Sequence, residues 1–203
     1  MRRIRIVVAY DGTNYCGWQI QPNGITIEEI LNRQISKLTG EDIRIIGASR
    51  TDSGVHALGN VAVFDTESRI PGDRFAYALN QKMPEDIVIV RSDEVQIDWH
   101  PRYQNEISKT YEYHIYNAKV RNPLKNRYST FVSFDLDVEK MRQGAKYILG
   151  EHDFASFCNV RTNAKDTVRT VHEITITEIP LDKFQASNWG QENSNLENET
   201  IIK

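Results

Sequence analysis

The chain has 203 residues, 39% of them hydrophobic and 26% charged, so one large domain or two small ones with a sizeable core can form. Two cysteines, Cys16 and Cys158, are too few for a disulfide framework, no apolar stretch approaches a membrane span, and the N-terminal segment is too short for a signal peptide; we therefore expect a cytoplasmic protein with reduced thiols. The net charge of −3 argues against indiscriminate nucleic-acid binding but leaves room for a local basic surface.

The first half of the chain predicts a split βαβ, or ferredoxin-like, order of elements. Its first helix is the best marked, because Thr26 and Glu29 can form a capping box at its start and Gly40 ends the apolar repeat. The second helix is expected to end before Pro84. In chain order, we expect a strand at 4–9, a helix from 26 to 40, strands at 43–48 and 60–65, a helix at about 73–82 and a strand at 87–97.

The second half predicts a similar but incomplete module. Asp137 is placed to cap a helix whose apolar stripe ends at Gly150. From residue 182 onward the chain is rich in asparagine and acidic residues and has no hydrophobic period, so we expect a disordered tail. The other elements expected in this half are strands at 109–117, 128–134 and 168–179.

These elements predict an α+β fold class with a largely antiparallel sheet. The sheet would be built from two βαββαβ-type modules, of which the second is incomplete. The expected domains are a first module at 1–106 that carries the loop described next, a partial second module at 107–181 and a tail at 182–203.

The loop GASRTDSGVHALG, at residues 47–59, combines Arg50, Asp52 and His56 with small residues. One interpretation is an ordinary turn, in which Asp52 accepts hydrogen bonds from backbone amides, its Thr and Ser neighbours satisfy other amides, and His56 is a half-buried histidine at a strand entrance. A turn does not need the arginine, however, and a nearby cation keeps a carboxylate ionised, as a nucleophile or a base requires. The pattern leaves both a structural turn and an active site open.

Tyr111 is a second candidate. Along KTYEYHI, strand alternation places Tyr111, Tyr113 and Ile115 on one face. All three residues could belong to the core, but if that face lined a cleft, an aromatic ring there could stack on a nucleobase. Periodicity does not separate these alternatives.

Basic residues gather in the later loops. They are either solvated loop residues or part of a phosphate-binding rim. The first group is Lys119, Arg121, Lys125 and Arg127, and the second is Arg161, Lys165 and Arg169.

The motifs of this chain resemble those of the TruA-type tRNA pseudouridine synthases from residue 4 to about residue 179. Residues 10–21 are similar to the opening YDGT-x-Y-x-GWQ-x-Q of that family, and the loop at 47–59 is similar to its catalytic G-A-x-RTD-x-GVHA stretch. Several such matches in one order are far more specific than any one of them. The further matches are LNQKMPEDI at 79–87, the H-x-R of His100 and Arg102, SKTYEY at 108–113, GEHDFASFC at 150–158 and TVRTV at 167–171.

The resemblance implies a pseudouridine synthase fold and an isomerase that converts uridine to pseudouridine at tRNA positions 38–40, in the anticodon stem-loop. Asp52 would be the catalytic carboxylate, Arg50 would help to evict the target uridine, and Tyr111 would pack on the flipped base. Whether Asp52 attacks the ribose or abstracts a proton from it stays open. Contacts with the substrate are also expected from His56, Lys109 and Arg169.

The resemblance further implies that the protein needs no metal and no organic cofactor. Its expected partners are tRNA and a second copy of the chain, in a homodimer or another self-associated form, and no membrane is involved. A third kind of activity, acid hydrolysis, would need a second carboxylate paired with Asp52, and Asp11 is better explained as part of a turn.

The C-terminal segment departs from the family pattern. The family continues with a strand and a helix containing roughly G-N-GF-L-x-x-M-VR, and PLDKFQASNWGQENSNLENETIIK has no counterpart. The missing elements would supply an apolar contact and an arginine to the active site. A second function therefore stays open, that of a non-catalytic or impaired RNA-binding relative.

Overall fold

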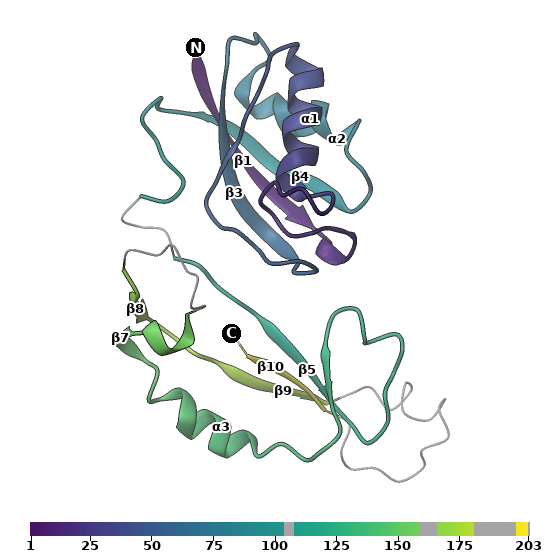
Figure 1. Ribbon diagram of the computed structural model, residues 1–203, viewed down its shortest axis with the longest axis vertical. Helices are drawn as coiled ribbons and strands as arrows, with labels where there is room; N and C mark the ends of the chain where they lie inside the picture. Colours follow the sequence, from purple (N-terminus) through teal and green to yellow (C-terminus); the bar gives the residue numbers. More distant parts are fainter. Residues whose placement is uncertain (104–107, 159–165, 181–197, 203) are drawn as a thin grey trace. The chain divides into compact units, whose positions relative to one another are not determined.

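The structure, a computed structural model, describes residues 1–103, 108–158, 166–180 and 198–202 (Figure 1). The chain divides into two compact units, Met1–Ser108 and Lys109–Lys203, each with its own strands and helices. Within the described residues, no helix has the length and apolar character needed to cross a membrane.

Unit 1 is built on a four-stranded antiparallel sheet in the order β2-β3-β1-β4. The chain order is strand, helix, strand, strand, helix, strand, as predicted for the first half. The elements are β1 (Arg2–Tyr10), α1 (Ile27–Thr39), β2 (Ile46–Gly47), β3 (Ala57–Thr66), α2 (Phe75–Asn80) and β4 (Ile87–Val95).

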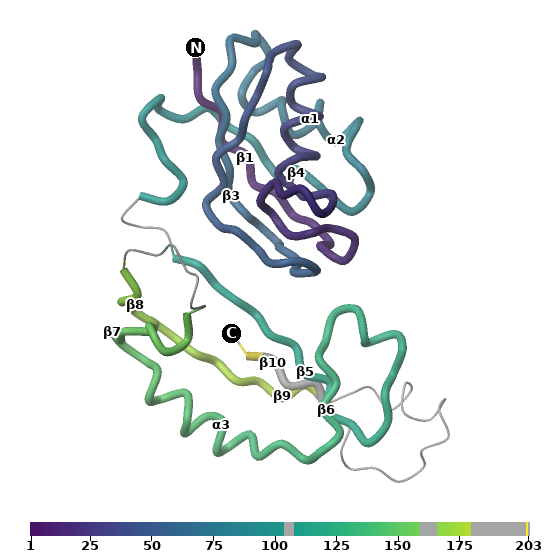
Figure 2. Tube along the Cα trace, viewed as in Figure 1, coloured from purple at the N-terminus to yellow at the C-terminus, as the bar shows by residue number. Residues whose placement is uncertain are grey.

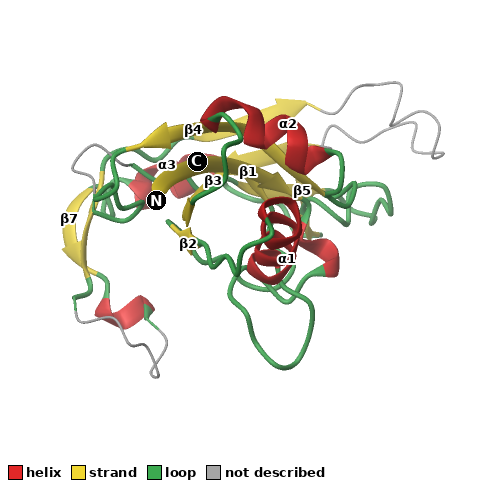
Figure 3. Cartoon of the chain, turned by 90° about the horizontal axis from the view of Figure 1, so that it is seen from above, coloured by secondary structure: helices red, strands yellow, loops and turns green. Residues whose placement is uncertain are grey.

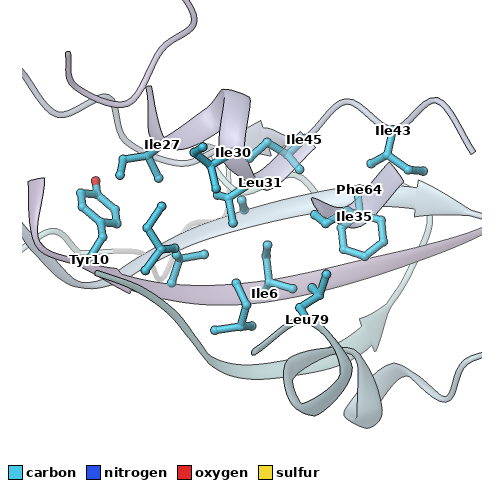
Figure 4. Packing of buried hydrophobic residues seen from close by; sticks show 14 of the residues in the cluster. Ile6, Tyr10, Ile27, Ile30, Leu31, Ile35, Ile43, Ile45, Phe64 and Leu79 are labelled. Atoms are coloured by element: carbon cyan, nitrogen blue, oxygen red, sulfur yellow. The ribbon is translucent and has the colours of Figure 1, made fainter. Parts of the chain in front are cut away.

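The core of unit 1 lies between one face of this sheet and the two helices. In β1, every second side chain from Ile4 to Tyr10 is buried, as expected for a strand with one covered face. Helix α1 contributes apolar residues that recur at helical spacing, and Leu79 comes from α2. Figure 4 shows the α1 side chains on the side of the helix that faces Ile6 of β1 and Phe64 of β3.

The two ends of α1 are where the sequence predicts them. The Thr26 hydroxyl accepts a hydrogen bond from the Glu29 amide at 3.3 Å, which satisfies one of the free amides of the first turn. At the other end, Gly40 takes the left-handed conformation with φ 76°, and its amide bonds to the Ser36 carbonyl.

The strand predicted at 43–48 is much shorter in the structure, where β2 contains only Ile46 and Gly47 (Figure 3). The reason lies in α1. The Ile43 amide donates to the Ser36 hydroxyl and the Ile45 amide donates to the Asn32 side chain, both at 2.9 Å. These amides are satisfied by helix side chains, so Ile43 and Ile45 pack against the core without joining the ladder.

Unit 2 contains a four-stranded sheet in the order β6-β5-β10-β9 and a separate β7-β8 pair (Figure 2). All of its strand pairs are antiparallel except β5 with β6, so the predicted mixture of helices with largely antiparallel sheet is confirmed. The elements are β5 (Tyr113–Asn117), β6 (Thr130–Val132), α3 (Val138–Ala145), β7 (Gly150–Asp153), β8 (Val168–Val171), β9 (Ile176–Pro180) and β10 (Asn198–Ile202).

The C-terminal segment differs from the disordered tail predicted at 182–203. Its last described residues, 198–202, form β10, which pairs with both β5 and β9. The β-branched residues of the Thr-Ile-Ile run favour a strand. This run is too short to show a period, and only tertiary pairing supplies its hydrogen-bond partners. The preceding residues, 181–197, lie outside the described part of the chain.

The single strand predicted at 168–179 is divided into two. β8 pairs with β7, whereas β9 pairs with β10, and residues 172–175 between them belong to neither strand. The division arises because the two halves have different partners, in different sheets. The predicted helix after Asp137 is present, but it ends at Ala145, five residues before Gly150.

Candidate active site

A pocket of about 460 Å³ lies beside Asp52 in unit 1. One set of lining residues, Arg50 to Ser53, comes from the loop between β2 and β3. The other set comes from the segment between β1 and α1, which the sequence analysis did not assign to the site. Its motif, YDGT-x-Y-x-GWQ-x-Q, was the signal that could have identified it. These lining residues are Cys16, Gln19, Ile20, Gln21 and Asn23.

The Asp52 loop is attached to this second segment by hydrogen bonds. The Trp18 amide donates to the Thr51 carbonyl at 3.0 Å, and the Thr51 hydroxyl is 2.9 Å from the hydroxyl of the buried Tyr10. The Ser53 hydroxyl and the Gly54 amide both donate to the Tyr15 carbonyl, at 3.2 and 3.3 Å. The backbone on both sides of Asp52 is therefore held in place.

Two glycines allow the segments to approach this closely. A Cβ atom on Gly17, which has φ 82°, would lie 2.5 Å from the Thr51 carbonyl oxygen. A Cβ atom on Gly12 would overlap the carbonyl oxygen of Val55. Only glycine fits where two backbones meet at such distances. The glycines of the N-terminal motif therefore help to shape the Asp52 loop.

The Asp52 side chain is exposed and is not used to build the turn. Its carboxylate makes no hydrogen bond or ion pair with any described residue, whereas its backbone carbonyl accepts from the Val55 amide at 3.2 Å. The hydroxyls of Thr51 and Ser53 bind Tyr10 and the Tyr15 carbonyl rather than neighbouring amides. The interpretation of this loop as turn chemistry alone does not account for the carboxylate.

Arg50 lines the same pocket as Asp52 and is also exposed. No ion pair between the two is found among the described residues, so both charges face solvent at the pocket. The pocket therefore presents both a carboxylate and a guanidinium to a ligand. A polar or charged ligand that enters the pocket would meet an acceptor and several donors.

His56 connects the Asp52 loop to the end of β1. Its Nδ1 atom accepts a hydrogen bond from the Gly12 amide at 3.1 Å and lies 3.1 Å from an Asp11 carboxylate oxygen. The two contacts hold the imidazole between the Gly12 backbone and the Asp11 side chain, so His56 ties the loop to the turn that follows β1. Asp11 also accepts from the Thr13 amide, which confirms that it is part of a turn.

Arg102 is attached to the strand that leads into the loop. Its Nε atom donates to the Gly47 carbonyl at 2.8 Å, across 55 positions of the sequence. Gly47 in turn packs directly against the Trp18 ring. The H-x-R motif at His100 and Arg102 thus brings the segment after β4 to the edge of β2, a role that its sequence position alone does not reveal.

Tyr15 donates a hydrogen bond from its hydroxyl to Asp86 at 2.6 Å, and its ring is buried. Burial, followed by the Asp86 carboxylate, raises the pKa of Tyr15 above its ordinary value. The folded protein therefore favours the protonated phenol. Stability from this bond is fully present below about pH 10, the ordinary tyrosine pKa, and is lost as the pH rises above it.

We expect Tyr15→Phe to lower the free energy of unfolding by about 2 kcal/mol at pH 7, because it removes the hydrogen bond from the Tyr15 hydroxyl to the charged Asp86 carboxylate. The loss should shrink above about pH 10. Urea denaturation at a series of pH values measures both effects. The matched control is Tyr77→Phe, at a largely exposed position, which should leave stability unchanged. A Tyr15 variant as stable as the parent at pH 7 would contradict the prediction.

The remaining candidates belong to unit 2. Tyr111 precedes β5 and is 73% exposed, whereas Ile115 is buried and the Tyr113 hydroxyl bonds to Thr130 at 3.0 Å. Tyr113 is itself 56% exposed, so the interpretation of all three as core residues is wrong for Tyr111 and Tyr113 and holds only for Ile115. Lys109 also precedes β5, and Arg169 lies in β8.

The basic loops of unit 2 are partly engaged in contacts of their own. Lys119 forms an ion pair with Asp135 at 2.7 Å, and the Arg121 guanidinium lies over the Phe131 ring. Arg161 and Lys165 lie outside the described residues. The phosphate-binding rim stays a prediction.

Comparisons with known proteins agree with the resemblance. The family described as tRNA pseudouridine synthase matches residues 6–104 and 145–188. The chain is 47% identical to the tRNA pseudouridine synthase A of Acetivibrio thermocellus, over 94% of this chain and 78% of that protein. It is 46% identical to the enzyme of the same name from Thermoanaerobacter pseudethanolicus, over 87% and 72%, and 44% identical to that from Brevibacillus brevis, over 88% and 73%. The matched segments include the Asp52 loop and the motif that lines its pocket, and the chain belongs to the tRNA pseudouridine synthase family.

Proposed function

We propose that this protein isomerises uridine to pseudouridine at positions 38–40 of tRNA, with Asp52 as the catalytic carboxylate. One observation carries the proposal. The backbone on both sides of Asp52 is held in place, and its side chain, which has no partner among the described residues, lines a pocket that Arg50 also lines. The names of the relatives support the reaction type and the tRNA substrate.

The reaction is an exchange of one bond for another on the same ribose. The bond from C1′ to N1 of uracil breaks, a bond from C1′ to C5 forms, and the hydrogen on C5 is replaced by one on N1. The target base must first leave its helix, at a cost of a few kcal/mol. Asp52 can take part either by attacking C1′ or by accepting a proton from the sugar.

Arg50 is proposed to help evict the uridine and to contact the RNA in its place. Its exposed guanidinium lies at the same pocket as Asp52 and has no hydrogen-bond partner among the described residues, so its donors can meet phosphate or base oxygens. His56 is proposed as a further substrate contact on the resemblance. Lys109 and Arg169 are proposed as substrate-binding residues of unit 2 on the resemblance alone.

We further propose that the two units are ferredoxin-like modules, with domains at 1–106 and 107–181. The order of elements in unit 1 supports the first module. A homodimer in the cytoplasm is proposed from the resemblance.

Incubation of the protein with unmodified tRNA, followed by mapping of pseudouridine, tests the proposed function. Pseudouridine at positions 38–40 is the expected result. Specific tRNA binding without any pseudouridine would instead favour a non-catalytic RNA-binding relative. Absence of both would contradict the proposal. Light scattering of the same sample tests the homodimer.

Tyr111 is expected to act through its ring. Stacking of a base on an aromatic side chain contributes about 1–3 kcal/mol, so Tyr111→Ala should lower turnover by a factor on the order of 10 to 100. Tyr111→Phe keeps the ring and should remain within about threefold of the parent. Single-turnover assays with tRNA measure both, with Tyr147→Ala as an exposed control in the same unit. Equal losses in the two variants would point to the hydroxyl instead.

A further inference from the structure

Gln19 has no role in the site as described so far, although it lines the pocket beside Asp52. Its side chain is exposed, and its carboxamide forms no hydrogen bond with the described residues. A primary amide offers one acceptor and two donor hydrogens at its end. A neutral group of this kind suits a neutral base better than it suits phosphate.

The backbone around Gln19 is held on both sides. The amide of Trp18 donates to Thr51, as described, and the Trp18 carbonyl accepts from the Glu28 amide at 3.0 Å. After Gln19, the Ile20 amide donates to the Glu28 carboxylate at 3.0 Å. Glu28 lies in the first turn of α1, which begins at Ile27. The helix start and the Asp52 loop therefore determine where Gln19 enters the pocket.

Two other amide side chains line the pocket, those of Gln21 and Asn23. The Gln21 amide donates to the Cys16 carbonyl, so it closes its own turn. Asn23 lies farther along that turn, whose only described ladder contact is the bridge between Gln21 and Gly24. Gln19 combines a fixed backbone with an unengaged amide among the described residues.

The chemistry of the reaction creates a need for such a group. Once the bond from C1′ to N1 has broken, uracil is held only by non-covalent contacts, and it must turn until C5 faces C1′. Rotation about the axis through N3 and C6 exchanges N1 with C5 and O2 with O4. The edge formed by N3–H and its two flanking carbonyls has the order acceptor, donor, acceptor both before and after this rotation. A carboxamide can therefore bind N3–H and one of the carbonyls in both orientations of the base.

We propose that the Gln19 carboxamide holds uracil by its N3–H and one flanking carbonyl while the base turns over in the Asp52 pocket. The inference rests on the proposed function. Glu28 acts as a positioning residue, because its backbone and carboxylate bind the residues on either side of Gln19.

Two substrates and two enzymes test the proposal together. Methylation of N3 on the target uridine removes the N3–H group, from which the Gln19 carboxamide oxygen would accept a hydrogen bond. For the parent, this change should lower single-turnover rate by about tenfold or more, because a hydrogen bond and its geometry are lost. Gln19→Ala should itself lower the rate by about tenfold on unmodified RNA, and N3 methylation should then cost little further.

A second measurement separates holding of the base from a merely structural effect. A base that is released but not held can escape, and water can then add at C1′ in its place. Gln19→Ala should therefore produce free uracil and abasic RNA from labelled substrate, while the parent should not. Glu28→Ala should do the same to a smaller degree, and Glu28→Gln, which keeps an acceptor for the Ile20 amide, should restore the parent behaviour. Gln81→Ala, at an exposed position after α2, is the control.

The outcomes distinguish this inference from the proposed function. A parent enzyme that forms no pseudouridine would overturn both. An active parent, combined with an equal cost of N3 methylation in parent and Gln19→Ala, would overturn the role of Gln19 alone. Thermal unfolding of each variant shows whether a loss of rate reflects loss of fold.

Discussion

Asp52→Asn is expected to abolish pseudouridine formation, with a fall in single-turnover rate by a factor on the order of 10⁴. Asparagine has nearly the same size, but its amide is neither a nucleophile nor a base. Because the Asp52 carboxylate binds no described residue, the substitution breaks no bond of the fold there. Binding of tRNA and the thermal midpoint should therefore stay close to those of the parent.

The measurement is a single-turnover assay at saturating enzyme, with a binding titration on the same tRNA. Asp42→Asn provides the matched control, since Asp42 is also exposed in unit 1 but does not line the pocket. This control should retain full activity. Turnover close to the parent's in Asp52→Asn would show that another group performs the chemistry.

Gly17→Ala is expected to cost both stability and activity. The new Cβ atom would lie 2.5 Å from the Thr51 carbonyl oxygen, in a backbone with φ 82°. Left-handed backbone strain and overpacking together should lower the free energy of unfolding by about 3 kcal/mol. Relief of the clash must separate the turn from the loop and weaken the bond from the Trp18 amide to Thr51. Turnover should fall by a factor on the order of 10², since Asp52 is then misplaced.

Gly40→Ala separates the clash from the backbone strain. Gly40 has a similar φ of 76°, but a Cβ atom there would meet nothing within 4 Å. This variant should lose only about 1 kcal/mol and keep its activity. Urea denaturation and single-turnover assays on both variants make the comparison. If Gly17→Ala and Gly40→Ala lost the same amount of stability and had the same activity, the contact between Gly17 and the loop would not position Asp52.

The site was only partly predictable from the sequence. The resemblance of the sequence motifs to a family indicated Arg50 and Asp52, and the structure brings both residues to one pocket. Gln19 belongs to the opening motif, but nothing local in the sequence indicates that residues 16–23 lie beside residues 50–53. That neighbourhood depends on hydrogen bonds such as the one from Trp18 to Thr51, which join positions far apart in the chain.

The sequence by itself determined the elements whose causes are local. Thr26 and Gly40 set the ends of α1 through a side-chain cap and a left-handed glycine, and alternation of apolar residues set the buried face of β1. Tertiary structure alone decided the length of β2, where Ser36 and Asn32 take the amides that a strand would use. It also decided β10, since a short strand forms only where β5 and β9 supply its hydrogen-bond partners.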